Sequence, residues 1–425
     1  MRIIVLSNQF PYPTGFGSAV HLWSITETLI KRGHEVHFCC YGYDKDNNLG
    51  EWYGADVPFP VQKLKSKGVM LYFVPKIEPK LQKLWPSRMG VLRKILFPTS
   101  KDYYSGALYT EKISEIVSKI APDAIVAWTV DSVAALPLPL FSDTPRMVSL
   151  VDLDHLVRAF KRIYKPTTHS KRKYESLLNE FAQRNFSRIV VNLLRGCDIV
   201  VDHAAQHCRW LQSKGLKQVN YFPVPVLDSV GTLWRECRLK ESNLKKKMKV
   251  SLIGNVNGIA TLSGLYFFAN EIIPEIERLE IKTDFEIDII GGGEIPAELL
   301  KAFDRPYIII RGYVDDIQKE YLSTDVLFVP TPIDLGFRTR ISEGFSFGCC
   351  VVAHSANAAG MPEIHDGKNA LLASSGNMLT DALVKCLNSA ELRYQLGTSA
   401  RETFERELDG EMICTKMIEQ LETLI

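Results

Sequence analysis

Short apolar runs alternate with amphipathic stretches along the first half of the chain. The first run, RIIVLS at residues 2–7, is followed by a Pro/Gly loop, a helical pattern over about residues 19–31 and a second apolar run, EVHFCC. This order predicts a strand–helix–strand unit with buried parallel strands. Later runs, DAIVAWT, RMVSLVDL and CDIVVDH, repeat the pattern. We therefore expect an open parallel sheet with helices on both faces.

The alternation stops between residues 220 and 249, where NYFPVPVLDS is followed by the highly charged RECRLKESNLKKKMK. Five further apolar runs come after it: VSLIGN, DFEIDIIGGG, YIIIRGYV, DVLFVPT and CCVVAHS. They predict a second doubly wound domain, and the remaining residues are helical in period. We predict Rossmann-like domains over residues 1–225 and 249–405, a linker over 226–248, and a C-terminal helix over 406–425 that could pack back on the first domain.

Length and composition narrow the class of protein. A chain of 425 residues is too long for one compact core, which favours two domains. A net charge of +2 argues against a protein built as a whole for nucleic acid. The nine cysteines lack metal-ligand spacing, and the doublets FCC and GCC lie in apolar runs, which favours a reducing compartment. With neither a signal peptide nor a membrane span in the pattern, we expect a cytoplasmic protein whose membrane contacts are peripheral.

Charge gathers at residues 334–350, DLGFRTRISEGFSFGCC, between two apolar runs. A helix that begins inside this segment would present backbone N–H groups to an anion, and Gly336 would allow a close approach. Arg338 and Arg340 would add charge-assisted hydrogen bonds, and Glu343 could accept two hydroxyls of a ribose. The segment therefore predicts a nucleoside diphosphate site, with a solvated basic loop as the alternative.

Three sequence blocks together resemble family 4 of the GT-B glycosyltransferases. The blocks are GFRTRISEGFSFGCCVVAH, GMPEIHDGKNALL and PYPTGFGSAVHLWSITETLIKRGHEVH. The resemblance implies a GT-B fold, in which two Rossmann-like domains face a cleft, the donor binds the C-terminal domain and the acceptor binds the N-terminal domain. It also implies transfer with retention. In the family, the glutamate at the position of Glu343 binds the nucleotide ribose, and the turn at Gly336 and Phe337 contacts the phosphates and the sugar.

The chain departs from the family pattern at two places. Many members carry a pair of glutamates eight positions apart. Glu343 matches the second of the pair, and this chain has Leu335 at the position of the first. Members also place an arginine and a lysine after the first strand of the C-terminal domain, where this chain has GNVNGIATLSG. We expect Arg338 and Arg340 to supply that charge, and Asn257 to remain as a polar contact.

Two further donor contacts follow from the resemblance and from turn glycines. The segment IIIRGYVDDIQ is similar to the family's base-binding strand end, where backbone groups near Tyr313 and Val314 would read the base. Tyr313 could instead be an ordinary aromatic at a strand end. Gly15 and Gly17 would let the N-terminal loop approach the donor diphosphate or the acceptor, with a plain turn as the alternative.

Polar groups also follow an apolar run in SLVDLDHLVRAF, at Asp152, Asp154 and His155. Relatives with a similar element place it beside the acceptor, and many use a histidine there to contact the donor sugar. A retaining transfer needs little from a general base, because the leaving diphosphate can take the acceptor proton. We take Asp154 as the residue that orients the acceptor, then Asp152 and His155. Helix capping by Asp154 is the alternative.

Basic and aromatic residues alternate at residues 158–174, RAFKRIYKPTTHSKRKY. Such a segment could hold an acceptor domain to an anionic membrane, although most charged runs are simply solvated faces.

The sequence predicts an enzyme that moves a sugar from a nucleoside diphosphate donor to a hydroxyl of a glycan or lipid-linked glycan, in polysaccharide or glycoconjugate biosynthesis. No metal and no cofactor are expected, because the arginines can neutralise the diphosphate. Nucleic acid is not an expected partner. A nucleotide-sugar epimerase on the same fold and a non-catalytic nucleotide-sugar-binding subunit remain as alternatives.

Overall fold

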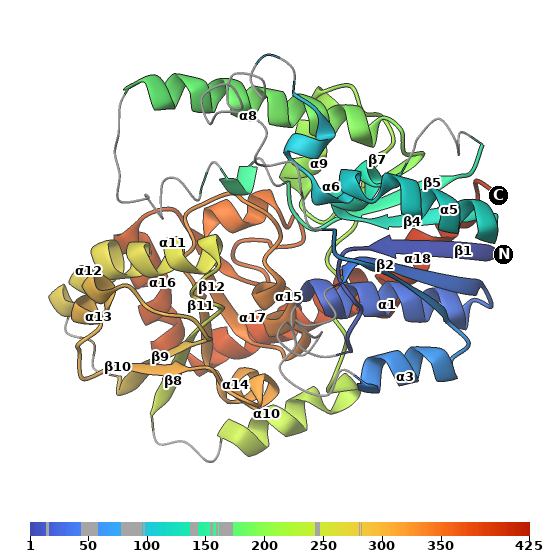
Figure 1. Cartoon of the computed structure of the whole chain (residues 1–425). Coiled ribbons are helices and arrows are strands. Elements are labelled where there is room, and N and C mark those ends of the chain that lie inside the picture. The colour runs from blue at the N-terminus through green and yellow to red at the C-terminus, as the bar shows by residue number, and fades with distance from the viewer. Residues whose placement is uncertain are drawn as a thin grey trace.

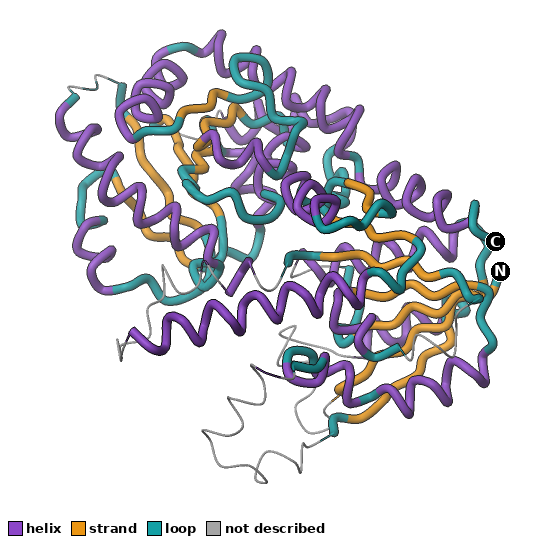
Figure 2. The backbone as a smooth tube through the Cα atoms, turned by 90° about the horizontal axis from the view of Figure 1, so that it is seen from above, coloured by secondary structure: helices purple, strands orange, loops and turns teal. Residues whose placement is uncertain are grey.

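The fold was analysed in a computed structural model of the chain. The structure describes residues 1–13, 17–43, 58–77, 96, 98–136, 143–153, 156–158, 160, 173–242, 247–279, 281 and 283–425. These residues form two parallel sheets, each flanked by helices (Figures 1 and 2). The predicted α/β architecture of two doubly wound domains is therefore confirmed.

The first sheet has seven strands in the order β3-β2-β1-β4-β5-β6-β7, and all its pairs are parallel. Its strands are β1 (Arg2–Ser7), β2 (Glu35–Tyr43), β3 (Met70–Pro75), β4 (Ala124–Trp128), β5 (Arg146–Leu150), β6 (Ile199–Asp202) and β7 (Val219–Tyr221). The strand order reverses between β1 and β4, which is the switch point where ligands bind in sheets of this kind.

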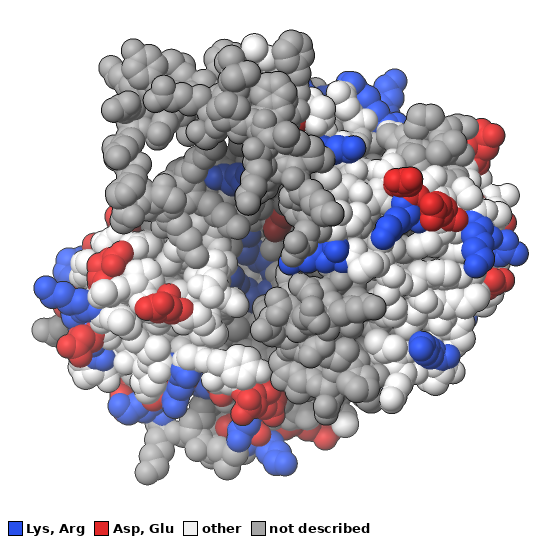
Figure 3. Space-filling model, in the orientation of Figure 1, with Lys and Arg blue, Asp and Glu red and all other residues white. Residues whose placement is uncertain are grey.

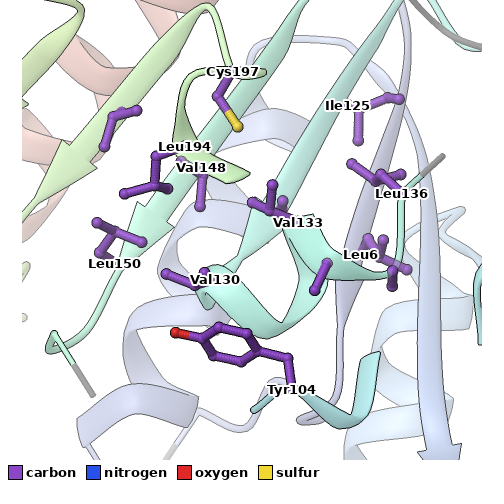
Figure 4. Packing of buried hydrophobic residues seen from close by; sticks show 14 of the residues in the cluster. Leu6, Tyr104, Ile125, Val130, Val133, Leu136, Val148, Leu150, Leu194 and Cys197 are labelled. Carbon is purple, nitrogen blue, oxygen red and sulfur yellow. The ribbon is translucent and has the colours of Figure 1, made fainter. Parts of the chain in front are cut away.

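The first sheet is buried on both faces, which explains its continuous apolar runs. Ile4 and Leu6 of β1 join the core on one face, and Ile3 and Val5 join the core on the other. Figure 4 shows the first of these cores, where Leu6, Ile125 and Val148 point from neighbouring strands toward residues of the covering helices. The helices of this domain are α1 (Gly17–Lys31), α3 (Pro58–Ser66), α5 (Thr110–Ile120), α6 (Thr129–Ala134), α8 (Lys173–Leu194) and α9 (Ala205–Ser213).

The second sheet has six parallel strands in the order β10-β9-β8-β11-β12-β13. Its strands are β8 (Met248–Ile253), β9 (Phe285–Ile290), β10 (Ile308–Gly312), β11 (Val326–Val329), β12 (Cys350–His354) and β13 (Leu371–Ala373). Its helices are α11 (Ile259–Phe267), α12 (Ile273–Arg278), α13 (Ala297–Ala302), α14 (Ile317–Ser323), α15 (Thr339–Ser346), α16 (Gly376–Asn388) and α17 (Ala390–Thr403). The switch point here lies between β8 and β11.

The chain returns to the first domain at its end. Helix α18 (Gly410–Glu422) buries Ile413, Met417 and Leu421 in the core of the first domain. Ion pairs with α1 and the turn after it hold its polar side, including Lys31 Nζ to Glu411 Oε1 at 2.7 Å. The two chain ends consequently lie at the same end of the molecule (Figures 1 and 2).

Part of the segment that the sequence marks as a linker is helical. Helix α10 (Trp234–Ser242) packs against α14 of the second domain, and Arg238 donates to the carbonyl oxygens of Tyr321 and Thr324. The charged composition that led us to expect a linker is therefore that of a surface helix docked on the second domain. None of the helices in the described ranges is long and apolar enough to cross a membrane.

Candidate functional site

The charged segment identified in the sequence lies where the two domains meet. Helix α15 begins at Thr339, after a loop that leads from the carboxyl end of β11. Gly336 in this loop has φ +71°, and a Cβ there would clash with Oδ1 of Asp152, which follows β5 in the first domain. Figure 3 shows basic side chains in the recess between the domains. The structure thus brings two predicted site residues, Gly336 and Asp152, face to face.

Arg338 is buried and bonded to the loop that precedes it. Its Nη2 donates to the carbonyl oxygen of Ile333 at 2.6 Å, its Nη1 to that of Leu335, and its Nε to Oδ1 of Asn357 at 2.8 Å. Asn357 Nδ2 in turn donates to the carbonyl oxygen of His354 at 2.6 Å. Burial, with the neighbouring guanidinium of Arg340, lowers the pKa of Arg338 to about 9. The side chain that we expected to meet phosphate therefore braces the loop, and a phosphate contact remains a prediction.

Arg340 lies at the carboxyl end of β8. Its Nη2 donates to Oγ1 of Thr261 on α11 at 2.8 Å. A Cβ on Gly254, the residue that follows β8, would lie 2.7 Å from Nη1 of Arg340, so the guanidinium fits only against a glycine. Burial lowers the pKa of Arg340, because the charged form loses its hydration. Arg340, on α15, thus places a positive charge at the end of β8, where the loop that follows the strand contains neither arginine nor lysine.

Glu343 lies one turn further along α15, on the side that faces Tyr321. The Tyr321 hydroxyl donates to Oε2 of Glu343 at 2.6 Å, and Tyr321 stacks on Phe347 with ring centroids 5.3 Å apart. Burial raises the pKa of Glu343, while the Tyr321 hydrogen bond opposes that rise. Among the described residues, no group bonds to Oε1 of Glu343, so this oxygen is open to a ligand hydroxyl. The sequence did not reveal Tyr321, whose only signal is its apolar position on a short helix.

The residues predicted for the base and the sugar lie around the same strand ends. Tyr313 follows β10 and is 77% exposed, while Val314 packs against the apolar cluster that contains Phe347. Asn257 lies in the turn between β8 and α11, where its backbone N–H donates to Oδ1 of Asn255 at 2.8 Å. Phe337 is partly buried against the same cluster as Val314. Tyr313 lies near Gly292 after β9, and its exposed ring leaves a contact with a nucleobase as a prediction.

Leu335 replaces the first glutamate of the family pattern, and the structure gives a physical reason. It is buried in a small apolar cluster with Ile333 and Ile259, and residues of the first domain pack against this cluster. The residues from the first domain are Leu156, Val157 and Phe160. The position is thus an apolar contact between the domains, where an unpaired carboxylate would be costly.

Fewer of the site residues predicted in the first domain lie within the described part of the chain. Gly15, Asp154 and His155 lie outside the described residues, and so does most of the basic segment 158–174. Gly17 is the first residue of α1. The roles predicted for these residues stay predictions.

A polar cluster that the sequence analysis missed lies at the carboxyl ends of β4, β5 and β6. The ring of His21, on α1, is 4.9 Å from Trp128 and 4.3 Å from His203. His203 Nδ1 donates to the carbonyl oxygen of Phe222 at 2.7 Å, so Nε2 of the neutral ring accepts from the Ser149 hydroxyl at 3.0 Å.

Burial keeps this cluster uncharged. It lowers the pKa of His21 well below its usual range, with a further contribution from His203, and it also lowers the pKa of His203. Within the described residues, Nε2 of His21 and Nε1 of Trp128 have no hydrogen-bond partner. The available sequence signal was that Trp128, Ser149 and His203 all lie at the ends of apolar runs.

Helix α9 links the two edges of the cleft. Gln206 Nε2 donates to the carbonyl oxygen of Asp334 at 3.0 Å, and the backbone N–H of Ala205 donates to that of Gly360 at 3.1 Å. Nearby, the Tyr221 hydroxyl lies 3.0 Å from both carboxylate oxygens of Glu363, whose pKa burial raises to about 6. The first domain therefore touches the loop that carries Gly336 directly.

The described side chains offer little for a metal ion. No group of three or more His, Cys, Asp or Glu residues within the described ranges is placed to hold one. The positive charge near the strand ends comes from Arg338 and Arg340 instead.

Comparison with known proteins gives the family of the second domain. Residues 248–389 match the model of the family described as glycosyl transferases, group 1. A search of curated protein sequences finds no match.

Solved structures resemble the whole chain. HepE from Anabaena, in complex with UDP, is 15% identical, with both chains fully covered and a TM-score of 0.66. Sucrose-phosphate synthase from Thermosynechococcus elongatus is 14% identical, covers 100% of this chain and 99% of its own, and has a TM-score of 0.68. WaaG, a glycosyltransferase involved in lipopolysaccharide biosynthesis, is 13% identical over 98% of this chain and 99% of its own, with a TM-score of 0.62.

At such low identity these structures show the GT-B fold alone, and the family match lies within the second domain. The chain thus has the GT-B fold, and its residues 248–389 are similar to the family of glycosyl transferases, group 1.

Proposed function

We propose that the protein transfers a sugar, with retention, from a nucleoside diphosphate donor to a hydroxyl of a glycan or glycolipid. One observation carries the proposal: Arg340, the start of α15 and Glu343 converge at the carboxyl ends of β8 and β11. A guanidinium and backbone N–H groups suit a diphosphate, and a carboxylate one turn away suits a ribose. The spacing of an anion site and a hydroxyl site fits one nucleotide better than two separate ligands.

The same groups would assist bond cleavage. As the sugar leaves the donor, negative charge grows on the diphosphate, and fixed dipoles and a guanidinium stabilise that charge in the transition state. The released diphosphate can accept the acceptor proton, so the first domain needs mainly to orient the acceptor. We assign this orienting role to Asp154, with Asp152 and His155 beside it. Asp152 supports the assignment through its place against Gly336.

We propose that transfer needs neither metal nor cofactor, because two guanidinium groups can offset the charge of the diphosphate. The structural likeness to WaaG, a glycosyltransferase involved in lipopolysaccharide biosynthesis, supports a role in polysaccharide or glycoconjugate synthesis, and the likeness to HepE in complex with UDP-glucose supports a nucleotide-sugar donor. We further propose a cytoplasmic location, with residues 158–174 as a contact to an anionic membrane.

The test is product analysis with UDP-, GDP- and ADP-sugars and a panel of glycan and glycolipid acceptors, with and without EDTA. We expect a glycosylated acceptor from one donor, with the donor's anomeric configuration retained by NMR and the rate unchanged by EDTA. An inverted product would refute retention, and loss of activity with EDTA would refute metal independence. An epimerised free nucleotide sugar would replace the transferase with an epimerase.

A second function, a non-catalytic nucleotide-sugar-binding subunit, is favoured by one observation. Leu335 removes a carboxylate that many relatives have near the donor sugar. Calorimetric binding of a donor without transfer or hydrolysis across the acceptor panel would establish this function instead.

A further inference from the structure

A basic groove lies on the first domain, between α8 and α9. Its lining includes Arg184 and Arg188 of α8, Arg195 just after that helix, Trp210 of α9 and Lys214 just after α9, and its volume is about 330 Å³. Figure 1 shows α9 beneath the carboxyl-terminal half of α8. We refer to this feature as the α8–α9 groove. It is separate from Arg340 and Glu343, which lie in the other domain.

The cations of the groove form an ordered stripe. Arg184, Arg188 and Arg195 are spaced by four and seven residues, which places them along one face of a helical segment, and all three are exposed. Lys214 lies 5.5 Å from the ring centroid of Trp210, and Arg195 donates to Oδ1 of Asn192 at 3.0 Å.

This stripe carries positive charge that the described part of the chain leaves uncompensated. No acidic side chain is among the described residues that line the groove, and none of them forms an ion pair with these cations. Like charges four residues apart on a helix repel each other. The free protein therefore holds a charge arrangement that a bound anion would relieve.

The shape of the groove indicates the chemistry of the ligand. Arginine forks bind carboxylates and phosphates through paired hydrogen bonds, so the exposed guanidinium groups of the groove suit an acidic sugar. A bilayer surface would instead call for protruding apolar side chains, and the described side chains of α8 and α9 include no large apolar one that is exposed. The groove is a hollow, which accepts a chain-like ligand better than a flat sheet of head groups.

The groove is connected to the cleft by a single helix. Gln206, near the start of α9, contacts the loop that carries Gly336, while Trp210 and Lys214 lie further along the helix axis by about 6 and 12 Å. A glycan whose accepting end lies in the cleft can follow α9 and place a later residue in the groove. We propose that the α8–α9 groove binds a carboxylate- or phosphate-bearing sugar of the acceptor, away from the hydroxyl that reacts. This inference rests on the proposed function, since it identifies the acceptor as an acidic glycan.

Calorimetric titration of the full-length protein tests the proposal. The probes are an oligogalacturonate, a phosphomannan fragment, a neutral maltohexaose and vesicles of phosphatidylglycerol. We expect at least one acidic oligosaccharide to bind, with an affinity that falls as salt rises, and the neutral oligosaccharide not to bind. Any vesicle binding, which we assign to residues 158–174, should be the same in the groove variant described next as in the wild type. The variant with both Arg188→Gln and Arg195→Gln should lose at least tenfold in affinity. It should also fold as well as the wild type, because these exposed side chains hold no ion pair with the described part of the chain.

The matched control is the variant with both Lys112→Gln and Lys119→Gln, which removes two exposed charges from α5 of the same domain. Its affinity should stay within twofold of the wild type. An equal loss in the control, no binding of either acidic oligosaccharide, or vesicle binding that the groove variant abolishes would each overturn the proposal.

Failure of the groove and failure of the proposed function can be told apart. UDP, GDP and ADP should produce the same thermal shifts in the groove variant as in the wild type, because the donor groups lie in the second domain. A wild type that binds acidic oligosaccharides but no nucleotide would retain the groove and reject the donor site.

Discussion

The two domains meet the cleft with opposite kinds of polar group. The second-domain edge, formed by Arg338, Arg340 and Glu343, carries formal charges in a buried setting. Apart from the Asp152 carboxylate that faces Gly336, the first-domain edge, formed by His21, Trp128, Ser149 and His203, is polar but uncharged, because burial lowers the pKa of both histidines. Both edges lie at carboxyl ends of parallel strands, so topology alone does not produce the difference.

The difference teaches how one fold divides the work of a transfer reaction. A charged edge suits an anionic ligand that must be held while negative charge grows on it. A neutral edge of imidazole, indole and hydroxyl groups suits an uncharged sugar with its hydroxyls. Charged groups would bind such a sugar no better, and they would cost more to desolvate. If the donor and acceptor sites follow this division, substitutions at the two edges must fail in different ways.

The largest effect is expected for Arg340→Ala. Removing this guanidinium should lower kcat/KM at least 100-fold, about 3 kcal/mol, because it acts where charge develops. Binding of UDP should weaken as well, while binding of uridine should not. Steady-state kinetics and calorimetry measure both. Arg278→Ala, which removes an exposed arginine from α12, is the control and should leave both unchanged. Equal effects of the two variants would remove Arg340 from the site.

Arg338→Ala should act on stability first. The change removes the guanidinium that donates to the carbonyl oxygens of Ile333 and Leu335 and to Oδ1 of Asn357, which should cost about 3 kcal/mol of unfolding free energy. Arg338→Lys should recover little, because one ammonium cannot reach three acceptors in the fork geometry. Urea unfolding measures the loss, and Arg340→Ala should show a smaller one. Full stability with lost UDP binding would make Arg338 a ligand-binding residue instead.

The neutral first-domain edge predicts a dependence on acid. A histidine whose pKa is lowered by folding stabilises the protein above the unfolded value near 6.5, and this contribution is lost as the pH falls below it. Each such group costs about 1.4 kcal/mol for every pH unit below 6.5, down to its folded pKa. His21→Phe should therefore lose less stability than the wild type between pH 7 and pH 5, by at most about 2 kcal/mol, which is the limit for a group that stays neutral in the folded chain.

At pH 8 the same variant should differ from the wild type by less than about 1 kcal/mol, since the imidazole is neutral in both the folded and the unfolded chain there. Urea unfolding at the two pH values provides the measurement. If the unfolding free energy of the wild type and that of His21→Phe both stay constant between pH 7 and pH 5, burial does not keep this edge neutral.

The smallest expected effect is that of Glu343→Gln. Loss of the carboxylate should weaken the binding of UDP about tenfold, or about 1.4 kcal/mol, because the carboxylate accepts hydrogen bonds from the ribose. The same substitution should have no effect on a 2′,3′-dideoxy analogue of UDP, which lacks the hydroxyls. Titration of both ligands against both proteins completes a double-mutant cycle. A tenfold loss for both ligands would mean that Glu343 supports the loop through Tyr321 and does not contact the ribose.

Local patterns predicted the fold well because the signals were local. Continuous apolar runs marked five strands of each sheet, since a parallel sheet covered on both faces needs them. The strands β3, β7 and β13, each at the edge of a sheet, were not predicted. The same patterns placed Arg340 and Glu343 on a helix that begins at a strand end, where α15 lies. The position of Gly336 at a turn with positive φ also follows from its residue type.

The contacts within the site could not be predicted, because they join distant parts of the chain. The carbonyl partners of Arg338 depend on how one loop folds back on itself, and the Tyr321 hydroxyl reaches Glu343 from a different helix. His21 and His203 are far apart in the sequence and meet only when α1 packs beside β6. Leu335 reads as a missing carboxylate until its apolar neighbours from the other domain are seen.

A crystal structure of the protein with UDP tests the central claim most directly. We expect diphosphate oxygens within about 3 Å of the Arg340 guanidinium and of backbone N–H groups at the start of α15, with a ribose hydroxyl on Oε1 of Glu343. Nucleotide bound away from α15, or with its phosphates turned from Arg340, would contradict it.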